Sequence, residues 1–314
     1  MINICSLSDK NYLHYLLSLY KSIDRTTSSE FTFYTLCIDD ESYQILNSKN
    51  LKNMVLVKIK EVEDSEIYKR LYENTDYKPL SSENTYCWSL ASFFQNYVME
   101  THNTKDIFYI DADILFYNDI KDIHDFVSQK SIGIMLHRHN EIGSYVGAYN
   151  VGIIYFKNDE VGRNCIKWWR DVTIDPHNKW AKEYGTCGDQ KYLELFDVLF
   201  GKENVCVLDE KIGHGAPWNL GIYNYLDSDI GGEIIWECLD HKGKKVNCGL
   251  SDIKRNQKMY FIHFSQFTPD YKNSRYRYDR SGAWVELNIY NNPHVKTYYD
   301  DYFAKTLESL MELV

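Results

Sequence analysis

The sequence lacks the paired cysteines that mark a structural zinc site. Its eight cysteines are scattered singly, and no two of them stand at C-x-x-C spacing. Zinc ribbons and fingers depend on such spacing, so the pattern argues against them. A chain of 314 residues that is 44% hydrophobic can bury a large core without disulfides. We therefore expect a reduced, cytoplasmic protein.

Long apolar runs are also missing. No stretch reaches the roughly 20 apolar residues that a membrane helix needs. Residues 1–5 lack the basic flank and the apolar run of a signal peptide. These absences predict a soluble protein whose membrane contact, if it has any, is peripheral at the inner membrane face.

The sequence has no excess of positive charge, since its formal net charge is -10. Nucleic-acid phosphates reward a basic face, so this balance argues against a nucleic-acid partner. It also disfavours simple electrostatic docking on anionic membranes. Aromatic residues are plentiful at 15%, including 27 Tyr and 7 Trp. Such side chains pack cores, and they also stack on sugar rings and nucleobases.

Glycine-rich phosphate loops are absent too. The segment Ser6 to Asn11, which follows the first expected strand, contains no glycine and therefore no G-x-G-x-x-G cradle. No G-x-x-x-x-G-K-[ST] motif occurs either. A bound diphosphate would need another source of positive charge, and a metal ion held by carboxylates would supply it.

The order of apolar patterns predicts an α/β fold with a mostly parallel central sheet flanked by helices. The segment at residues 67–82 is polar and rich in tyrosine, and we expect a loop there. We expect strands at residues 2–7, 31–38, 54–59, 106–110, 132–136, 151–156 and 259–264. We expect helices at residues 13–23, 39–47, 84–99, 161–171, 188–200 and 294–313.

The strongest chemical signal is Asp111-Ala112-Asp113, directly after an apolar strand. If the chain stays extended, the two carboxylates point to the same side. Neighbouring carboxylates repel each other unless a cation lies between them. Open α/β sheets bind ligands beyond the carboxyl ends of their strands, where this pair would lie. Acidic pairs also occur in surface loops, so the motif alone leaves that alternative open.

His263 is a candidate third ligand, because it lies near the end of another short apolar strand. Taken alone, a histidine among aromatic residues is also compatible with a satisfied core residue. Carboxylates together with an imidazole suit Mn²⁺ better than the all-oxygen sites of Mg²⁺ or Ca²⁺. We expect Mn²⁺, with Mg²⁺ as the alternative.

Several stretches, in the right order, resemble the retaining GT-A glycosyltransferases of glycosyltransferase family 8. They resemble a group of bacterial nucleotide-diphospho-sugar transferases more closely still. The resemblance spans residues 1 to about 270, so it implies a GT-A catalytic domain at residues 1–270. Residues 271–314 would then form a loop and a helix packed on that domain. The similar stretches are residues 8–12 with 21–23, 109–114, 149–153 and 188–193, and the strand of His263.

The resemblance also implies roles for single residues. Asp189 and Gln190 would be the catalytic pair that stabilises an oxocarbenium-like centre, with retention of the anomeric configuration. The metal ligands would be Asp111, Asp113 and His263. The donor, by resemblance a UDP-sugar, would be contacted by Ser6, Asp9, Tyr12, Asp111, Ala112 and Asn150.

The sequence departs from the family after the histidine. Family members have a Gly and a Lys-Pro-Trp there, whereas Ser265-Gln266-Phe267 stands here. The arginine that precedes the D-x-D strand in many members is not evident either. The cation that contacts phosphate is therefore open. Lys272 and Arg275 are the nearest substitutes, and a solvated basic loop is the alternative for both.

Two further segments carry polar and aromatic residues. Residues 213–219 resemble a segment of the bacterial group, and we expect Trp218 and Asn219 to contact the acceptor or donor sugar. His137-Arg138-His139 ends another expected strand. It could meet an anionic group, but we expect surface residues there.

The sequence thus predicts a metal-dependent glycosyltransferase that moves a sugar from a UDP-linked donor to a glycan or glycolipid acceptor. The bacterial resemblance favours a role in surface polysaccharide synthesis, such as lipopolysaccharide or capsule. A phosphatase of the haloacid-dehalogenase type is one alternative, but Ile114 follows the D-x-D where that class has Thr or Val. An inactive nucleotide- or sugar-binding protein is the other.

Overall fold

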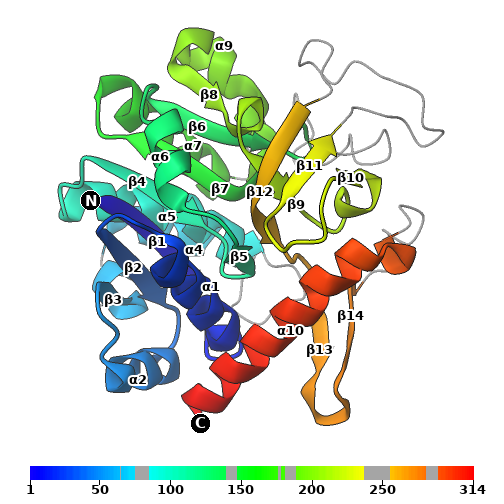
Figure 1. Cartoon of the computed structure of the whole chain (residues 1–314). Helices are drawn as coiled ribbons and strands as arrows, with labels where there is room; N and C mark the ends of the chain where they lie inside the picture. Colours follow the sequence, from blue (N-terminus) through cyan, green and yellow to red (C-terminus); the bar gives the residue numbers. More distant parts are fainter. Residues whose placement is uncertain are drawn as a thin grey trace.

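Seven strands form the central sheet of the protein (Figure 1). The computed structural model describes residues 1–63, 65–74, 85–138, 147–175, 178–180, 189–236, 255–280 and 289–314. The strands of this sheet are β1 (Ile2–Ser8), β2 (Phe31–Cys37), β3 (Met54–Lys58), β4 (Asp106–Ile110), β6 (Ile132–Leu136), β7 (Tyr149–Lys157) and β8 (Val205–Val207). Their order is β3-β2-β1-β4-β7-β6-β8. Only β7 runs antiparallel to its neighbours, which confirms the mostly parallel sheet.

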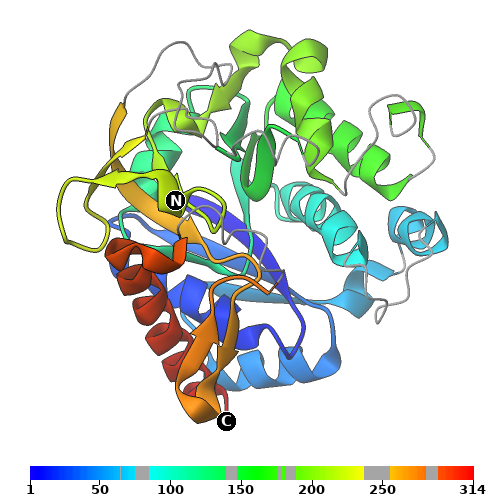
Figure 2. The same ribbon diagram turned by 90° about the vertical axis from the view of Figure 1, so that its right-hand side faces the viewer.

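Helices cover both faces of this sheet (Figure 2). One face packs against α1 (Leu13–Thr26), α2 (Asp40–Lys49) and α6 (Ile120–Val127). The other face packs against α3 (Ile59–Glu63), α4 (Glu66–Asn74), α5 (Thr85–Thr101) and α7 (Glu160–Ile174).

Strand β4 shows why the sheet needs both layers. Its side chains alternate, with Ile107 and Tyr109 in the core beneath α5, and Phe108 and Ile110 in the core beneath α1. Every residue of the strand is buried. An apolar strand covered on both faces is typical of a central strand in an α/β sheet.

A second, smaller sheet adjoins the first. Its order is β10-β11-β12-β5, and β9 pairs in parallel with β12. Because β5 follows β4 directly, the chain crosses from the large sheet to the small one at residues 111–113. The strands of this sheet are β5 (Ile114–Phe116), β9 (Gly213–Gly215), β10 (Asn224–Tyr225), β11 (Glu233–Trp236) and β12 (Arg255–His263).

The C-terminal helix α10 (Pro293–Leu313) packs along α1 and against the small sheet (Figure 1). The ring of Tyr302 stacks on that of Phe264 with centroids 3.9 Å apart. A ribbon of β13 (Thr268–Asp270) and β14 (Arg275–Arg277) connects β12 to this region. The division at residue 270 into a catalytic domain and a C-terminal extension stays a prediction.

Two expectations from the sequence need correction. Helix α4 occupies part of the segment expected to be a loop, because Tyr68 and Leu71 lie one helical turn apart and are both buried. The helix expected at residues 188–200 is instead a 3₁₀ helix, η2 (Gln190–Leu195), followed by the short α9 (Phe196–Phe200), and residue 188 lies outside the described residues. No helix among the described residues is long and apolar enough to cross a bilayer.

The docking of α10 gives a test of the fold. Tyr302 is fully buried, and its hydroxyl has no hydrogen-bond partner among the described residues. We expect Tyr302→Ala to lower the free energy of unfolding by about 3–5 kcal/mol through loss of packing. Tyr302→Phe should change it by less than about 1 kcal/mol, because it removes an unpaired polar atom. Urea denaturation followed by circular dichroism measures both, and an equal cost for the two variants would contradict this packing.

Candidate active site

Asp111 and Asp113 lie at the corner where the chain leaves one sheet and enters the other. The N–H of Asp111 donates to the carbonyl of Gly152 in β7 (2.9 Å). The N–H of Phe264 donates to the carbonyl of Asp113 (2.9 Å). A bond from the N–H of Ile114 to the carbonyl of Asp111 (3.2 Å) closes a turn between the two carboxylates. The motif is therefore a turn, and not the extended segment that the sequence analysis assumed.

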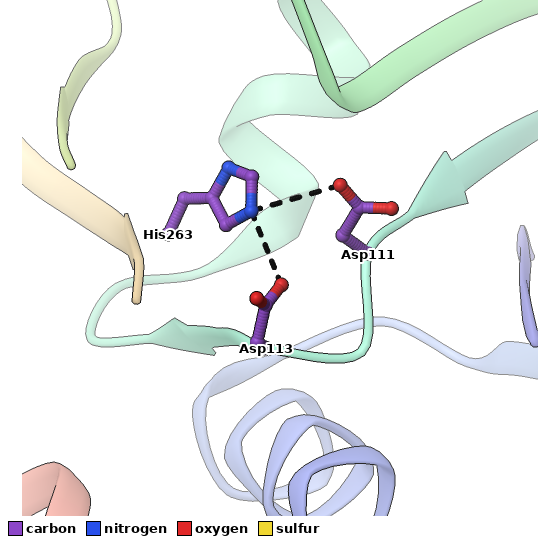
Figure 3. A group of neighbouring side chains, drawn as sticks. All are labelled: Asp111, Asp113 and His263. Atoms are coloured by element: carbon purple, nitrogen blue, oxygen red, sulfur yellow. Dashed lines mark ion pairs between the residues drawn. The ribbon is translucent and has the colours of Figure 1, made fainter. Parts of the chain in front are cut away.

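His263 comes to the same corner as the last residue of β12. The register of the small sheet pairs it with Ile114, the residue that follows Asp113. Its Nε2 lies 3.1 Å from Oδ1 of Asp113 and 3.6 Å from Oδ2 of Asp111 (Figure 3). One ligand atom from each of the three residues lies within 4.8 Å of the others. The structure thus brings together the three residues predicted as metal ligands.

The corner carries more negative charge than nearby cations balance. Burial raises the pKa of Asp111 to about 6, an increase that His263 opposes and Asp113 reinforces. Burial and the charge of Asp111 raise the pKa of Asp189 to about 8. Burial alone would lower the pKa of His263, but Asp113 and Asp111 raise it above its ordinary value. Each shift reflects carboxylates that burial and close approach make costly to ionise.

This donor set fits a divalent cation. Two carboxylate oxygens and one imidazole nitrogen face a common point, and such mixed sets suit Mn²⁺ and other borderline metals. A cation at that point would offset both the cost of burial and the repulsion by Asp113 that raise the pKa of Asp111. The corner can therefore hold a metal ion through Asp111, Asp113 and His263.

The residues expected near the donor sugar surround this cluster. Asn150 in β7 accepts a hydrogen bond on Oδ1 from Nδ1 of His263 (3.2 Å) and donates from Nδ2 to Oε1 of Gln190 (3.4 Å). Asp189 is buried next to Asp111, and its carbonyl accepts a bond from the indole of Trp169 (3.0 Å). Strand β7 and the start of η2 therefore deliver these side chains to one side of the corner.

The residues expected to contact the nucleotide differ in exposure. Tyr12, at the start of α1, is 44% exposed and lies close enough to Asp113 to feel its charge. Asp9 accepts bonds from the N–H groups of Asn11 and Tyr12 (3.0 Å each), so its carboxylate shapes the turn into α1. Ser6 is fully buried, which leaves it no surface for the nucleotide contact that the resemblance implies.

Trp218 and Asn219 are neighbours in sequence but have different surroundings. The ring of Trp218 lies edge-on to that of His263, with centroids 5.7 Å apart, so it borders the cluster. Asn219 is fully buried, and its amide bonds the N–H of Ala216 (2.8 Å) and the carbonyl of His137 (3.0 Å). Asn219 therefore shapes the loop, and the expectation that it contacts a sugar is wrong for this structure.

Lys272 and Arg275 both lie at the β13–β14 ribbon and are exposed. The guanidinium of Arg275 pairs with Asp270 at 2.8 Å. No interaction among the described residues connects either cation to the metal cluster. Their role as phosphate contacts stays a prediction, and their position favours the solvated alternative.

A comparison with known families decides which class of enzyme carries this corner. The sequence model described as "Glycosyl transferase family 8" matches residues 3–167, which is more than half of the chain. The chain belongs to glycosyl transferase family 8. The match includes Asp111, Asp113 and Asn150 but ends before Asp189 and His263, so those two are assigned to the site by geometry.

The chain is also similar to two bacterial proteins and to a solved structure. The protein YfnF of Bacillus subtilis (strain 168) is 29% identical over 249 residues, which cover 74% of this chain and 76% of YfnF. YfnD of the same organism is 26% identical over 206 residues, 64% of this chain and 63% of YfnD. A crystal structure of an active-site mutant of LgtC matches 91% of this chain and 95% of its own at a TM-score of 0.50 and 13% identity. That likeness supports the GT-A fold of this glycosyltransferase.

The glycosyltransferase site has a buried polar support that the sequence analysis missed. Arg138, expected at the surface, is 4% exposed and pairs with the fully buried Asp209. His214 donates from Nε2 to Asp209 (2.9 Å), as does the N–H of Leu136 (2.7 Å). Burial opposes ionisation, yet Arg138 and His214 lower the pKa of Asp209 far below its ordinary value. The surface prediction for residues 137 and 138 is wrong, and residue 139 lies outside the described residues.

Arg280 is a second residue that the sequence analysis missed. Its N–H donates to the carbonyl of Gln266 (3.1 Å), three residues after His263. Its charge lowers the pKa of both Tyr12 and Tyr15, against the burial that raises them. Tyr12 thus feels both the positive charge of Arg280 and the negative charge of Asp113. No local sequence motif predicts this arginine, because its backbone bond to Gln266 spans the β13–β14 ribbon.

The raised pKa of Asp189 predicts a pH-dependent stability. Its pKa is about 8 in the folded metal-free protein and about 4 when unfolded, so its contribution to stability is lost as pH rises from about 4 to about 8. Asp189→Asn should remove this loss and make the metal-free protein more stable at pH 8, on the order of a few kcal/mol. Urea denaturation across this pH range measures it.

A matched substitution provides the control for that experiment. Asp229 is exposed, so Asp229→Asn should leave the pH dependence of stability as it is in the wild type. Equal pH profiles for Asp189→Asn and the wild type would show that Asp189 is not the buried acid that we describe.

Proposed function

We propose that this family 8 enzyme transfers a hexosyl group from a UDP-sugar to a glycan acceptor, with a bound divalent metal and retention of configuration. The observation that carries the proposal is the cluster of Asp111, Asp113 and His263 at the corner beyond β4. Ligands of open α/β sheets bind at such carboxyl ends. Membership of the family supports sugar transfer, and the cluster supports a metal that would bind the diphosphate.

Asp111, Asp113 and His263 would hold the metal, with Mn²⁺ preferred over Mg²⁺ because one ligand is an imidazole. When bound, the metal offsets negative charge on the leaving diphosphate. The protein itself holds the three metal ligands in place before the UDP-sugar binds. Backbone bonds to Gly152 and Phe264 provide that restraint.

On the nucleotide side, we propose that the uracil ring stacks on Tyr12. This side chain is exposed at the start of α1, and it feels the charge of Asp113. Asp9 would act by fixing the turn that presents Tyr12. The backbone at Ala112, between the two carboxylates, is the proposed contact for the ribose.

We propose Arg280 as the cation that contacts the diphosphate, in place of Lys272 and Arg275. It is exposed, its charge acts on Tyr12, and its backbone N–H bonds the loop that follows His263. A guanidinium suits a phosphate because it presents paired N–H donors. Arg275 already pairs with Asp270.

On the sugar side, we propose that Asp189 and Gln190 face the reacting carbon. Asp189 is a buried acid next to Asp111, and its carboxylate would stabilise a positive charge that develops nearby. Gln190 would hold the sugar by hydrogen bonds and is itself held by Asn150. Trp218 would supply an apolar wall beside His263.

The acceptor is proposed to be a glycan or glycolipid of a bacterial surface polysaccharide, such as lipopolysaccharide or capsule. The support is the similarity to two bacterial proteins, YfnF and YfnD of Bacillus subtilis. A lipid-linked acceptor would bring the enzyme to the inner face of the membrane as a peripheral protein.

Calorimetric titration of UDP, with and without Mn²⁺, tests the donor site. We expect binding that depends on Mn²⁺ and is abolished by Asp113→Ala, because the variant loses one of three metal ligands. Asp125→Ala, which removes an exposed carboxylate on α6, is the matched control and should bind like the wild type. Absence of UDP binding by the wild type in either condition would overturn the uridine assignment. Release of phosphate from simple esters would instead support the phosphatase alternative.

The role of Arg280 has its own test. Arg280→Ala should weaken UDP binding in Mn²⁺ by about 10- to 100-fold, the value of a charge-assisted hydrogen bond. Binding of uridine, which has no phosphate, should not change. Arg275→Ala and Lys272→Ala serve as controls and should bind UDP normally. A loss in these controls but not in Arg280→Ala would return the phosphate contact to the ribbon.

A further inference from the structure

A buried chain of hydrogen bonds runs from the backbone at Gly147 to the imidazole of His263. Nδ1 of His137 lies 2.7 Å from the carbonyl oxygen of Gly147, and Nε2 lies 3.1 Å from Nδ2 of Asn150. Oδ1 of Asn150 lies 3.2 Å from Nδ1 of His263. His137, Asn150 and His263 are 3%, 6% and 6% exposed, so water does not compete for these bonds.

The backbone at Gly147 fixes the direction of the first half of the chain. A carbonyl oxygen can only accept, so Nδ1 of His137 must carry the proton. A neutral imidazole protonated at Nδ1 has a free lone pair at Nε2. That lone pair accepts from the amide Nδ2 of Asn150.

The backbone at Gly152 fixes the second half independently. Its N–H lies 2.9 Å from Oδ1 of Asn150, and an N–H can only donate, so that atom must be the amide oxygen. The oxygen then accepts from Nδ1 of His263 as well. Both ends of the chain therefore require the same orientation of the Asn150 amide, with nitrogen toward His137 and oxygen toward His263.

We infer that His137 and Asn150 are positioning residues that hold the imidazole of His263 with its Nδ1–H directed at Asn150. Nε2 then faces Asp113 and Asp111, where the proposed metal would take the place of the Nε2 proton. Hydrogen bonds to the second nitrogen of a histidine ligand commonly set its tautomer and orientation. The inference rests on the proposed metal role of His263.

This role replaces the one that the resemblance implies for Asn150. Its amide donates to His137 and Gln190 and accepts from Gly152 and His263. Two donors and two acceptor positions are all that a primary amide offers. Asn150 therefore has no hydrogen-bonding capacity left for a donor sugar.

Gly152 shows how closely this chain is packed. A Cβ built at Gly152 would lie 2.7 Å from Oδ1 of Asn150 and 2.7 Å from Nδ1 of His263. Any side chain at this position would push those two atoms apart. Glycine thus permits the bond between Asn150 and His263 while its carbonyl holds the N–H of Asp111.

Nitrogen-15 NMR of the imidazoles in the metal-free protein tests this orientation directly. We expect the wild type to show a proton on Nδ1 of His263 that exchanges slowly with water, because Asn150 accepts from it in a buried position. In Asn150→Leu the same proton should be lost or exchange faster. An Nδ1 without a proton in the wild type, or equal exchange in the two proteins, would overturn the inference.

Binding of Mn²⁺ alone, measured by calorimetry, provides the second readout. Asn150→Leu and His137→Leu should weaken Mn²⁺ binding by about 10- to 100-fold, the usual effect of losing such a partner. His137→Gln should restore binding, because the glutamine oxygen can accept from Asn150 in place of Nε2. His124→Leu, which removes a partly buried histidine bonded to Asp106, should bind like the wild type.

The two measurements distinguish a failure of the positioning role from a failure of the proposed function. If the wild type does not bind Mn²⁺ or UDP, the proposed metal site fails, while the NMR result still decides whether Asn150 holds Nδ1 of His263. If folded Asn150→Leu and His137→Leu proteins both bind Mn²⁺ like the wild type, the positioning role is wrong although the metal site stands. Circular dichroism establishes that each variant is folded, and Gly152→Ala gives an independent disruption if a leucine variant is not.

Discussion

The geometry of the active site depends on the corner at residues 111–113, which both sheets hold by backbone hydrogen bonds. Strand β7 accepts from Asp111, and the residue after β12 donates to Asp113. Two carboxylates this close repel each other, so side-chain interactions alone would let them separate. Backbone bonds within two sheets cannot relax without disturbing the fold. The enzyme can therefore keep its ligands close together before a cation is present, which reduces the ordering cost of binding.

Much of the large sheet was predictable from the sequence, because its strands and helices follow periodic apolar patterns. β4 is an example, since each of its five residues is buried and the acidic pair follows directly. The short strands of the small sheet were not predictable. β5 and β9 have three residues each and no pattern of their own, and they form only because β12 lies between them. Helix α4 was missed because its buried face is a tyrosine and a leucine in an otherwise polar segment.

The candidate metal ligands were predictable from the sequence, but the buried residues that hold them in place were not. The acidic pair and His263 stand at the ends of apolar strands, and that is a local signal. The bond between Asn150 and His263 joins residues 113 positions apart, and the pair of Arg138 and Asp209 joins residues 71 apart. No local pattern encodes such pairs. The same limit explains Asn219, whose amide could equally have faced a sugar or its own loop until the fold placed it within hydrogen-bond distance of His137.

Asp209 on one side, and Asp111 with Asp189 on the other, show how a carboxylate's partners decide between a structural role and a binding role. Asp209 and Asp189 are buried, and Asp111 is partly buried. Asp209 is matched within the chain by Arg138, His214 and a backbone N–H, and its pKa falls far below its ordinary value. Asp111 and Asp189 have no comparable partner among the described residues, and their pKa values rise to about 6 and about 8. A carboxylate whose charge is balanced in this way stabilises a loop, but it has no free oxygen left to bind a ligand. An unbalanced group costs folding free energy, and that cost is recovered when a cation arrives. The excess charge at the corner is therefore the feature that makes this part of a stable α/β fold a candidate metal site.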